Sequence, residues 1–295
     1  MTHEIITKEK LSKHFNVKEN DIQIIDRLKG GMSNSNYIVK IKEEFFTFRI
    51  PGKNAFAFVD RHIEQSTLEL IKDLHIDGNL LIDLELETGY KISRFVEGTP
   101  LMVLNPADYY DRAANILKKL HQSSLKATND YAPFERLKKY EALVETEGIK
   151  HQANYYDILN RFLEFKPYLE ALPKVLCHND SQPSNFILRP DETLLLVDWE
   201  FGGNNDFFYD IACFGNNDFK FALGLLPVYL NRTPEKDEWL RLYLWRTFQC
   251  LQWHNVALYK EAIGLSQELH LDFKAIAEAY IVKANALFTQ ALSYR

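Results

Sequence analysis

The spacing of apolar residues changes near residues 97–100, and this change limits the possible folds more than any other feature of the chain. Before it, short β-branched or aromatic runs lie between Gly, Asn, Glu or Pro, a pattern typical of strands. After it, helical spacing dominates as far as Arg295. We therefore expect an α+β protein with two lobes, a β-rich N-terminal lobe at 1–97 and a larger helical lobe at 98–295.

The N-terminal lobe is expected to hold a small antiparallel sheet and one helix. That helix is predicted over 60–75, with Asp60 as its N-cap. In the helical lobe, Asn105 and Pro106 are expected to open a helix that ends near His121. The predicted strands cover residues 22–28, 36–41, 45–50, 90–95, 175–177, 186–189 and 193–199.

The 295-residue chain carries a formal net charge of −6, which argues against a nucleic-acid partner. Its three cysteines, Cys177, Cys213 and Cys250, are odd in number and lie in apolar sequence, so we expect buried, reduced thiols and a cytoplasmic location. The sequence contains neither an apolar signal sequence nor a long uncharged apolar run, and we expect no insertion into a membrane. The oligomeric state stays open at this stage.

A Gly- and Ser-rich stretch, KGGMSNSNY at residues 29–37, joins two of the predicted strands. Its glycines permit close approach of the backbone, and successive N–H groups with serine hydroxyls can bind phosphate oxygens. A flexible hairpin loop is the alternative interpretation. The stretch is not a Walker A loop, because no Lys-Ser/Thr pair follows the glycines. The residues expected to bind a nucleotide phosphate here are Gly30, Gly31, Ser33, Asn34 and Ser35.

Arg49 is predicted to lie on the face of its strand opposite Phe46 and Phe48. On that face its guanidinium could reach a phosphate and pair with Glu64 of the predicted helix. A solvated arginine at a strand edge is the alternative.

Two polar loops that follow apolar strands contain candidate catalytic residues. Asp180 and Asn185 stand five residues apart in VLCHNDSQPSNFIL, and Asp198 ends the apolar strand in LLLVDWEFGG. A carboxylate and an amide oxygen, from Asp198 and Asn185, can hold Mg²⁺, while Asp180 could accept a hydroxyl proton in phosphoryl transfer. Taken singly, each aspartate could instead cap a turn. Zinc and serine-hydrolase chemistry are disfavoured, because HExxH, CxxC and GxSxG are all absent.

The segments HNDSQPSN and LVDWE resemble the signatures of the choline/ethanolamine kinase family, within the aminoglycoside phosphotransferase superfamily of protein-kinase-like fold. The likeness is greatest to bacterial choline kinases. It also covers GGMSNSNY, FRIPG, VDRHIEQ, LCHND and VDWEFGGNNDFFYDIA, in that order, over about residues 25–215.

This resemblance implies an ATP- and Mg²⁺-dependent kinase. Asp180 would be the catalytic base, and Asn185 and Asp198 would hold Mg²⁺. His178 would brace the catalytic loop rather than handle protons, and Asp210 would tie that loop to the following helix. Further nucleotide contacts are implied for Arg49 paired with Glu64, for the hinge residues Phe95 and Val96, and for Gln182.

The acceptor implied by the family is a cationic amino alcohol, held by aromatic faces in a W-x-x-W pattern. Here Trp253 is present, but Val256, or Cys250 in the other register, replaces the second Trp. The substrate-binding residues we expect are Glu200, Trp253 and Tyr280, with Asp206 adding negative charge. Further candidates are Phe201, Phe207, Phe208 and Tyr209 for the aromatic faces, and His254 and Asn255 for hydrogen bonds to a primary amine or hydroxyl.

The incomplete Trp pair leaves the substrate open among choline, ethanolamine, thiamine and an aminoglycoside. A catalytically idle nucleotide-binding protein of the same fold is the alternative from another functional class. The presence of Asp180, Asn185 and Asp198 favours the enzyme.

Overall fold

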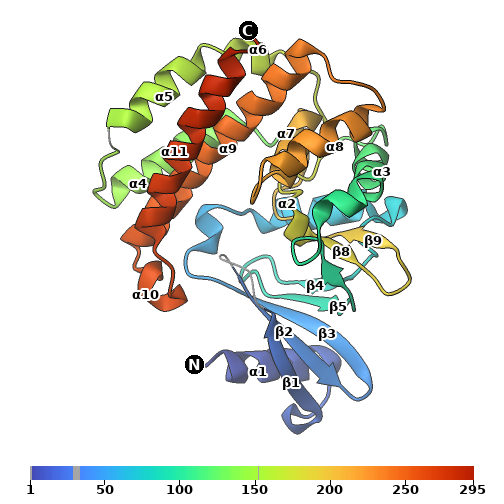
Figure 1. Ribbon diagram of the computed structural model, residues 1–295. Helices are drawn as coiled ribbons and strands as arrows, with labels where there is room; N and C mark the ends of the chain where they lie inside the picture. The colour runs from blue at the N-terminus through green and yellow to red at the C-terminus, as the bar shows by residue number, and fades with distance from the viewer. Residues whose placement is uncertain (1, 29–33, 152) are drawn as a thin grey trace.

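The computed structural model describes residues 2–28, 34–151 and 153–295. The predicted phosphate-binding residues Gly30, Gly31 and Ser33 lie outside these ranges. A small sheet with the N-terminal helix stands at one end of the molecule, and a larger helical part stands at the other (Figure 1). The α+β class and this unequal division are therefore confirmed, whereas the boundary near residue 97 stays a prediction.

The N-terminal sheet has five antiparallel strands in the order β1-β2-β3-β5-β4. Phe46, Phe48 and Ile50 of β3 point into its apolar face, while Arg49 points the other way. This alternation is the one that the sequence predicts. The elements of this part are α1 (His3–Phe15), β1 (Ile22–Leu28), β2 (Asn34–Ile41), β3 (Glu44–Pro51), α2 (Arg61–Leu70), β4 (Leu81–Leu84) and β5 (Lys91–Arg94).

Helix α1 corrects the expectation of one helix in this part of the chain. Thr2 caps its N-terminus by accepting a hydrogen bond from the Ile5 N–H, and Asn16 ends it in the left-handed conformation. Along the helix only Thr7 and Leu11 are buried. So short an apolar stripe gives little helical periodicity in the sequence, and the helix is missed for that reason.

Helix α2 begins where it was predicted, because the Asp60 carboxylate accepts the His62 N–H. It ends at Leu70, earlier than expected, and continues as a 3₁₀ turn over Lys72–Leu74. One side of α2 presents Glu64 to Arg49, and Leu68 joins the hydrophobic core of the helical part. The helix therefore connects the sheet with the rest of the molecule.

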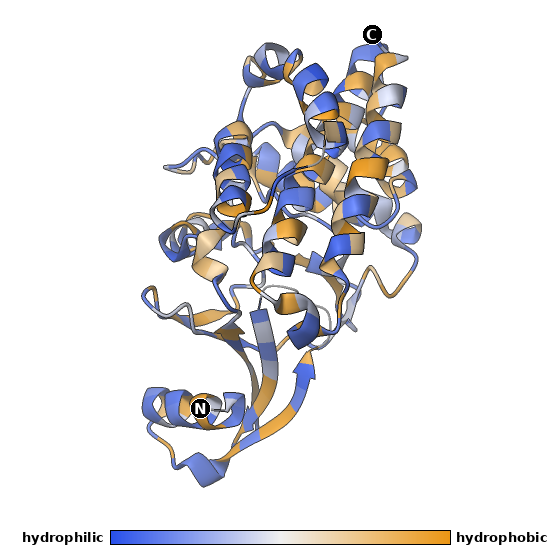
Figure 2. Ribbon diagram, turned by 90° about the vertical axis from the view of Figure 1, so that its left-hand side faces the viewer, coloured by the Kyte–Doolittle hydropathy of each residue, from blue (hydrophilic) through white to orange (hydrophobic). Residues whose placement is uncertain are grey.

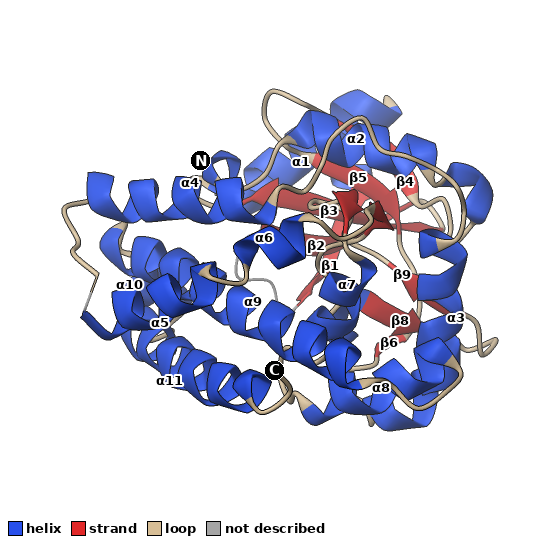
Figure 3. Ribbon diagram, turned by 90° about the horizontal axis from the view of Figure 1, so that it is seen from above, coloured by secondary structure: helices blue, strands red, loops and turns tan. Residues whose placement is uncertain are grey.

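The helical part surrounds two small sheets, β10-β7 and β6-β8-β9. Seen from above, the strands gather on one side and helices α5, α9 and α11 extend to the other (Figure 3). The predicted helix at Asn105 starts as a 3₁₀ turn, Pro106–Tyr109, before α3. The elements are β6 (Thr99–Pro100), α3 (Tyr110–His121), α4 (Pro133–Thr146), α5 (Ala153–Leu163), α6 (Lys166–Glu170), β7 (Val175–Cys177), β8 (Phe186–Leu188), β9 (Leu194–Leu196), β10 (Gly203–Asn205), α7 (Phe207–Phe214), α8 (Lys220–Leu230), α9 (Lys236–Ala262), α10 (Leu265–Leu269) and α11 (Phe273–Leu292).

Helices α9 and α11 run antiparallel side by side, with Lys236 at the start of α9 donating to the Arg295 carbonyl beyond α11 (Figure 1). Hydrophilic and hydrophobic residues alternate along these helices (Figure 2). As expected, Cys177, Cys213 and Cys250 are buried free thiols. In the described ranges, the helices are all too short or too polar to span a bilayer.

Candidate active site

The loop between β7 and β8 is held in one shape by His178. Its Nε2 donates to the Val197 carbonyl (3.0 Å), and its Nδ1 accepts the Asp180 N–H (3.2 Å). Burial lowers the pKa of His178 to about 4, so the ring is neutral at pH 7. His178 therefore links Asp180 to the strand that leads to Asp198, and it braces the loop as the resemblance implies.

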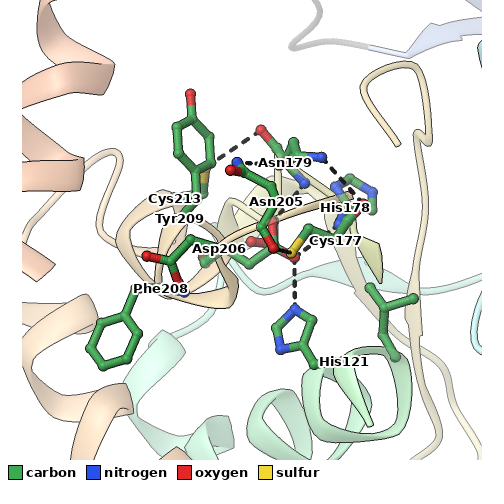
Figure 4. A network of polar contacts seen from close by, with 12 residues as sticks. His121, Cys177, His178, Asn179, Asn205, Asp206, Phe208, Tyr209 and Cys213 are labelled. Carbon is green, nitrogen blue, oxygen red and sulfur yellow. Dashed lines mark hydrogen bonds and ion pairs between the residues drawn. The ribbon is translucent and has the colours of Figure 1, made fainter. Parts of the chain in front are cut away.

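Asp210 anchors the same loop from helix α7, and Figure 4 labels three of its partners, His121, His178 and Asn179. Its carboxylate accepts the N–H groups of His178 (2.8 Å) and Asn179 (2.6 Å) and Nε2 of His121 (2.9 Å). Burial raises the pKa of Asp210, but the hydrogen bond and charge of His121 outweigh it, and the pKa is lowered overall. Ligand atoms of His121, Cys177 and Asp210 lie within 4.8 Å of one another, yet the His121 and Asp210 atoms are bonded to the protein. We assign this group to the support of the loop.

Asp180, the predicted base, has two amide donors on its carboxylate. Asn185 Nδ2 lies 3.1 Å from Oδ2, and Gln182 Nε2 lies 3.2 Å from Oδ1. Burial raises the pKa of Asp180, and the negative charge of Asp198 adds to the effect. The two aspartates that the sequence places 18 residues apart are thus close enough to interact through their charges.

Asp198 and Asn185 form the candidate metal site. Burial, and next the charge of Glu200, raise the pKa of Asp198 to about 7, and its carboxylate has no hydrogen-bond or ion-pair donor in the ranges that the structure describes. Asn185 uses its Nδ2 on Asp180, which leaves Oδ1 as an acceptor, and its carbonyl accepts the Val197 N–H (2.9 Å). This donor set of carboxylate and amide oxygens fits a hard divalent cation.

A buried ion cluster faces the site from the sheet. Arg49 holds Glu64 through two hydrogen bonds of 2.8 and 2.7 Å, as the sequence predicts. Arg61 (2.7 Å) and Lys91 (2.8 Å) also donate to Glu64. Burial opposes ionisation of Glu64, but Lys91 and Arg49 outweigh it, and its pKa lies well below the usual range. Glu64 is thus a fixed anion that orients three cations.

Glu200 belongs to this ion cluster. Its carboxylate pairs with Arg61 and accepts Asn34 Nδ2 (2.8 Å), while Arg49 Nη1 lies 3.5 Å away. A contact between Glu200 and a cationic substrate stays a prediction, and its charge is already shared with two arginines.

Of the other predicted nucleotide contacts within the described ranges, Ser35, Phe95 and Gln182 have partners inside the protein. Ser35 accepts Arg27 Nη2 (2.9 Å), and the Phe95 N–H donates to the Phe45 carbonyl (3.1 Å), so this hinge donor is engaged in the sheet. Gln182 bonds to Asp180 and Asn216. The roles of Ser35, Phe95, Val96 and Gln182 toward a nucleotide remain predictions.

A cavity of about 160 Å³ opens between the sheet and helices α9 and α10. Trp253, Phe201 and Val256 line it, together with Asn34 and Lys260. Tyr280 is not part of its lining, and burial raises the pKa of its hydroxyl, so its contact with the substrate stays a prediction. Trp253 therefore faces a space where a ligand could bind, and Val256 stands beside it in place of a second indole.

Four of the residues expected near the substrate are buried elsewhere. His254 bonds to the Ala277 carbonyl (2.9 Å), and Asn255 bonds to His151 (2.6 Å) and Tyr155 (2.9 Å). These groups lie at the interface of α9 with its neighbours, and their contact with an amine or hydroxyl of the substrate stays a prediction. Two others, Asp206 and Tyr209, have internal partners: Asp206 pairs with Arg241 and Trp245, and Tyr209 with Tyr131 and Gln252.

Sequence reasoning missed Arg61, Lys91 and His121. Lys91 lies opposite Arg49 in the β3–β5 pairing, and that register cannot be read from one strand alone. Arg61 follows the helix cap, and its i,i+3 spacing from Glu64 was a signal for their pairing, whereas its second carboxylate partner, Glu200, is 139 residues away.

Comparison with known proteins agrees with this geometry. The family model described as Choline/ethanolamine kinase matches residues 25–260. Protein LicA of Haemophilus influenzae is 28% identical over 251 residues, 80% of this chain and 73% of that protein.

Two solved structures are also similar. The choline kinase LicA from Streptococcus pneumoniae aligns over 97% of this chain and 98% of that one, with 26% identity and a TM-score of 0.78. LicA in complex with AMP aligns over 99% and 100%, again with 26% identity and a TM-score of 0.78. The expected kinase-like fold is therefore confirmed.

Proposed function

Since the chain belongs to the choline/ethanolamine kinase family, and is thus a phosphotransferase acting on an alcohol, we propose that it transfers the γ-phosphate of ATP to choline or ethanolamine with Mg²⁺. The observation that carries the proposal is the pair of neighbouring carboxylates, Asp180 with amide donors only and Asp198 with none in the described ranges. The similarity to a LicA protein that binds AMP supports an adenine nucleotide.

Asp180 takes the proton in this reaction. The O–H bond of the alcohol breaks toward the Asp180 carboxylate, the alcohol oxygen bonds to the γ-phosphorus, and the bond to the bridging oxygen breaks to release ADP. Asp198 and Asn185 Oδ1 would hold Mg²⁺, which when bound neutralises charge on the phosphates. Arg49, fixed by Glu64, would bind phosphate oxygens.

Trp253 and Phe201 would bind the ammonium group of the acceptor through their aromatic faces. Val256, or Cys250 in the other register, stands where the second Trp of the family pattern would fall, so one indole face is lost, and the other aromatic rings of the lining are Phe58, Tyr140 and Phe201. We therefore expect kcat/KM for choline to exceed that for ethanolamine by less than about 10³, or roughly 4 kcal/mol.

The experiment incubates the purified protein with ATP, MgCl₂ and, separately, choline, ethanolamine, thiamine or an aminoglycoside. Phosphorylated choline or ethanolamine should appear, and EDTA should abolish the reaction. If only thiamine or the aminoglycoside were phosphorylated, the proposed substrate would be wrong. Nucleotide binding without any product would favour the idle protein.

A further inference from the structure

A chain of hydrogen bonds connects helix α9 to the catalytic loop. It runs through four polar side chains, of which Asp180 is the last. Arg246 Nη2 donates to Asn216 Oδ1 (2.9 Å), and Asn216 Nδ2 donates to Gln182 Oε1 (2.7 Å). Gln182 Nε2 then donates to Oδ1 (3.2 Å) and Oδ2 (3.3 Å) of Asp180. Of these residues, Asp180 is the candidate base and Gln182 a predicted nucleotide contact, whereas Arg246 and Asn216 have no other role in the proposed reaction.

The direction of this chain is fixed by its first member. A guanidinium can only donate, so the Asn216 oxygen must face Arg246 and its NH₂ must face Gln182. The Gln182 oxygen is then occupied, and its NH₂ must face Asp180. Each amide is therefore held in one of its two orientations, and a hydrogen-bond donor is always presented to the carboxylate.

Arg246 is itself held firmly. Its side chain is 1% exposed, and Nη1 donates to Gln249 Oε1 (2.9 Å), whose Nε2 donates to the Tyr209 carbonyl (2.9 Å). No carboxylate forms an ion pair with Arg246 in the described part of the chain. A buried cation without an acidic partner costs free energy, and it is tolerated here through neutral amide and carbonyl acceptors.

The backbone of Asn216 accepts hydrogen bonds from two helices. Its carbonyl accepts both Arg246 Nη2 (3.1 Å) from α9 and Lys283 Nζ (2.9 Å) from α11. Its backbone therefore cannot follow a rotation of the side chain. Asn216 thus connects both helices of the C-terminal pair to Gln182 of the catalytic loop.

We propose that Arg246, acting through Asn216 and Gln182, is a positioning residue that orients the Asp180 carboxylate toward the acceptor hydroxyl. The inference rests on the proposed role of Asp180 as the base. It adds a function for α9 and α11 that no motif of the catalytic loop contains.

Asn216→Asp tests the orientation of the chain with almost no change of shape. The new carboxylate still accepts from Arg246, as an ion pair, but it presents an acceptor to Gln182 Oε1. Gln182 must then rotate to donate to the new carboxylate, so Asp180 loses the Gln182 donor and keeps only Asn185 Nδ2. We expect kcat to fall by about 10- to 100-fold, as for a misplaced catalytic group, with KM for ATP and the melting temperature not reduced.

Asn217→Asp is the matched control, because Asn217 is the exposed neighbour and the change in charge is the same. It should keep the wild-type kcat. In a Gln182→Met background, where the amide is gone, adding Asn216→Asp should lower kcat no further.

An unchanged kcat in Asn216→Asp, an equal loss in Asn217→Asp, or full additivity in the double variant would each overturn the inference. So would a rise in KM for ATP at constant kcat, which would assign Gln182 to the nucleotide. Asp180→Asn is measured in parallel. If it retains wild-type turnover, the proposed base is wrong, whereas an inactive Asp180→Asn with a fully active Asn216→Asp rejects only the positioning chain.

Discussion

The glutamates beside the cleft have cationic partners, whereas the aspartates of the catalytic loop do not. Glu64 receives hydrogen bonds from Arg49, Arg61 and Lys91, and Glu200 pairs with Arg61. Asp180, by contrast, has only amide donors on its carboxylate, and Asp198 has no donor in the described ranges.

This difference separates a structural group from a functional one. A carboxylate that already has its cations contributes to folding and orients those cations, and its pKa is low, as for Glu64. A buried carboxylate without a cation destabilises the folded protein and has a raised pKa, as for Asp198. A ligand that brings a cation is the natural partner of the second kind.

Removal of the base should have the largest effect. Asp180→Asn keeps the shape of the side chain but cannot accept a proton, and kcat should fall by about 10²–10⁴. Single-turnover kinetics under chemistry-limited conditions measure this step. A variant that keeps more than about a third of wild-type turnover would show that Asp180 is not the base.

Isosteric replacement of one acid from each group tests the comparison directly. Glu64→Gln leaves Arg49, Arg61 and Lys91 without their anion and should lower the free energy of unfolding by about 3–5 kcal/mol. Asp198→Asn removes an unpaired buried charge and should not lower it in EDTA. Denaturant unfolding measures both. Equal destabilisation by the two changes would contradict the distinction.

The stability of the metal-free protein should also depend on pH through Asp198. Its pKa is about 7 in the folded protein and near 3.8 when unfolded, so between these values the folded state binds the extra proton. Stability is therefore higher below this window and falls as the pH rises through it. Unfolding in EDTA at several pH values should show this fall in wild type, and Asp198→Asn should reduce it, while Asp180, whose pKa is also raised by burial, still contributes. An identical pH profile in the variant would remove Asp198 as its source.

The smallest effect is expected at the acceptor pocket. Trp253→Leu should raise KM for the amino alcohol by about 2- to 30-fold, equivalent to about 0.5–2 kcal/mol, with KM for ATP unchanged. Trp239→Leu is the control, since Trp239 lies on the same helix but does not line the cavity. If both KM values shift together with a large drop in melting temperature, Trp253 is a core residue.

Local sequence patterns predicted several contacts of this site correctly. Asp60 as a helix cap, the Arg49–Glu64 pair and the bracing role of His178 all follow from alternation, spacing or a motif, and the structure confirms them. The catalytic, metal and substrate roles of the remaining residues stay predictions, which the variants above test.

The contacts that the sequence could not predict depend on the register of strand pairing or join residues far apart in the sequence. Lys91 reaches Glu64 through strand pairing, and Asn216 reaches Gln182 across 34 residues. The internal partners of His254 and Asn255 could not be predicted, because α9 is buried on almost every side and its hydrophobic periodicity does not mark which face is the pocket.

The most direct test follows labelled phosphate from [γ-³²P]ATP in a single turnover with excess protein. The label should move to choline or ethanolamine only when the alcohol and Mg²⁺ are both present, and the Asp180→Asn protein should transfer it far more slowly. Transfer to the alcohol without any divalent cation, or release of the label as inorganic phosphate at the same rate without alcohol, would contradict the account.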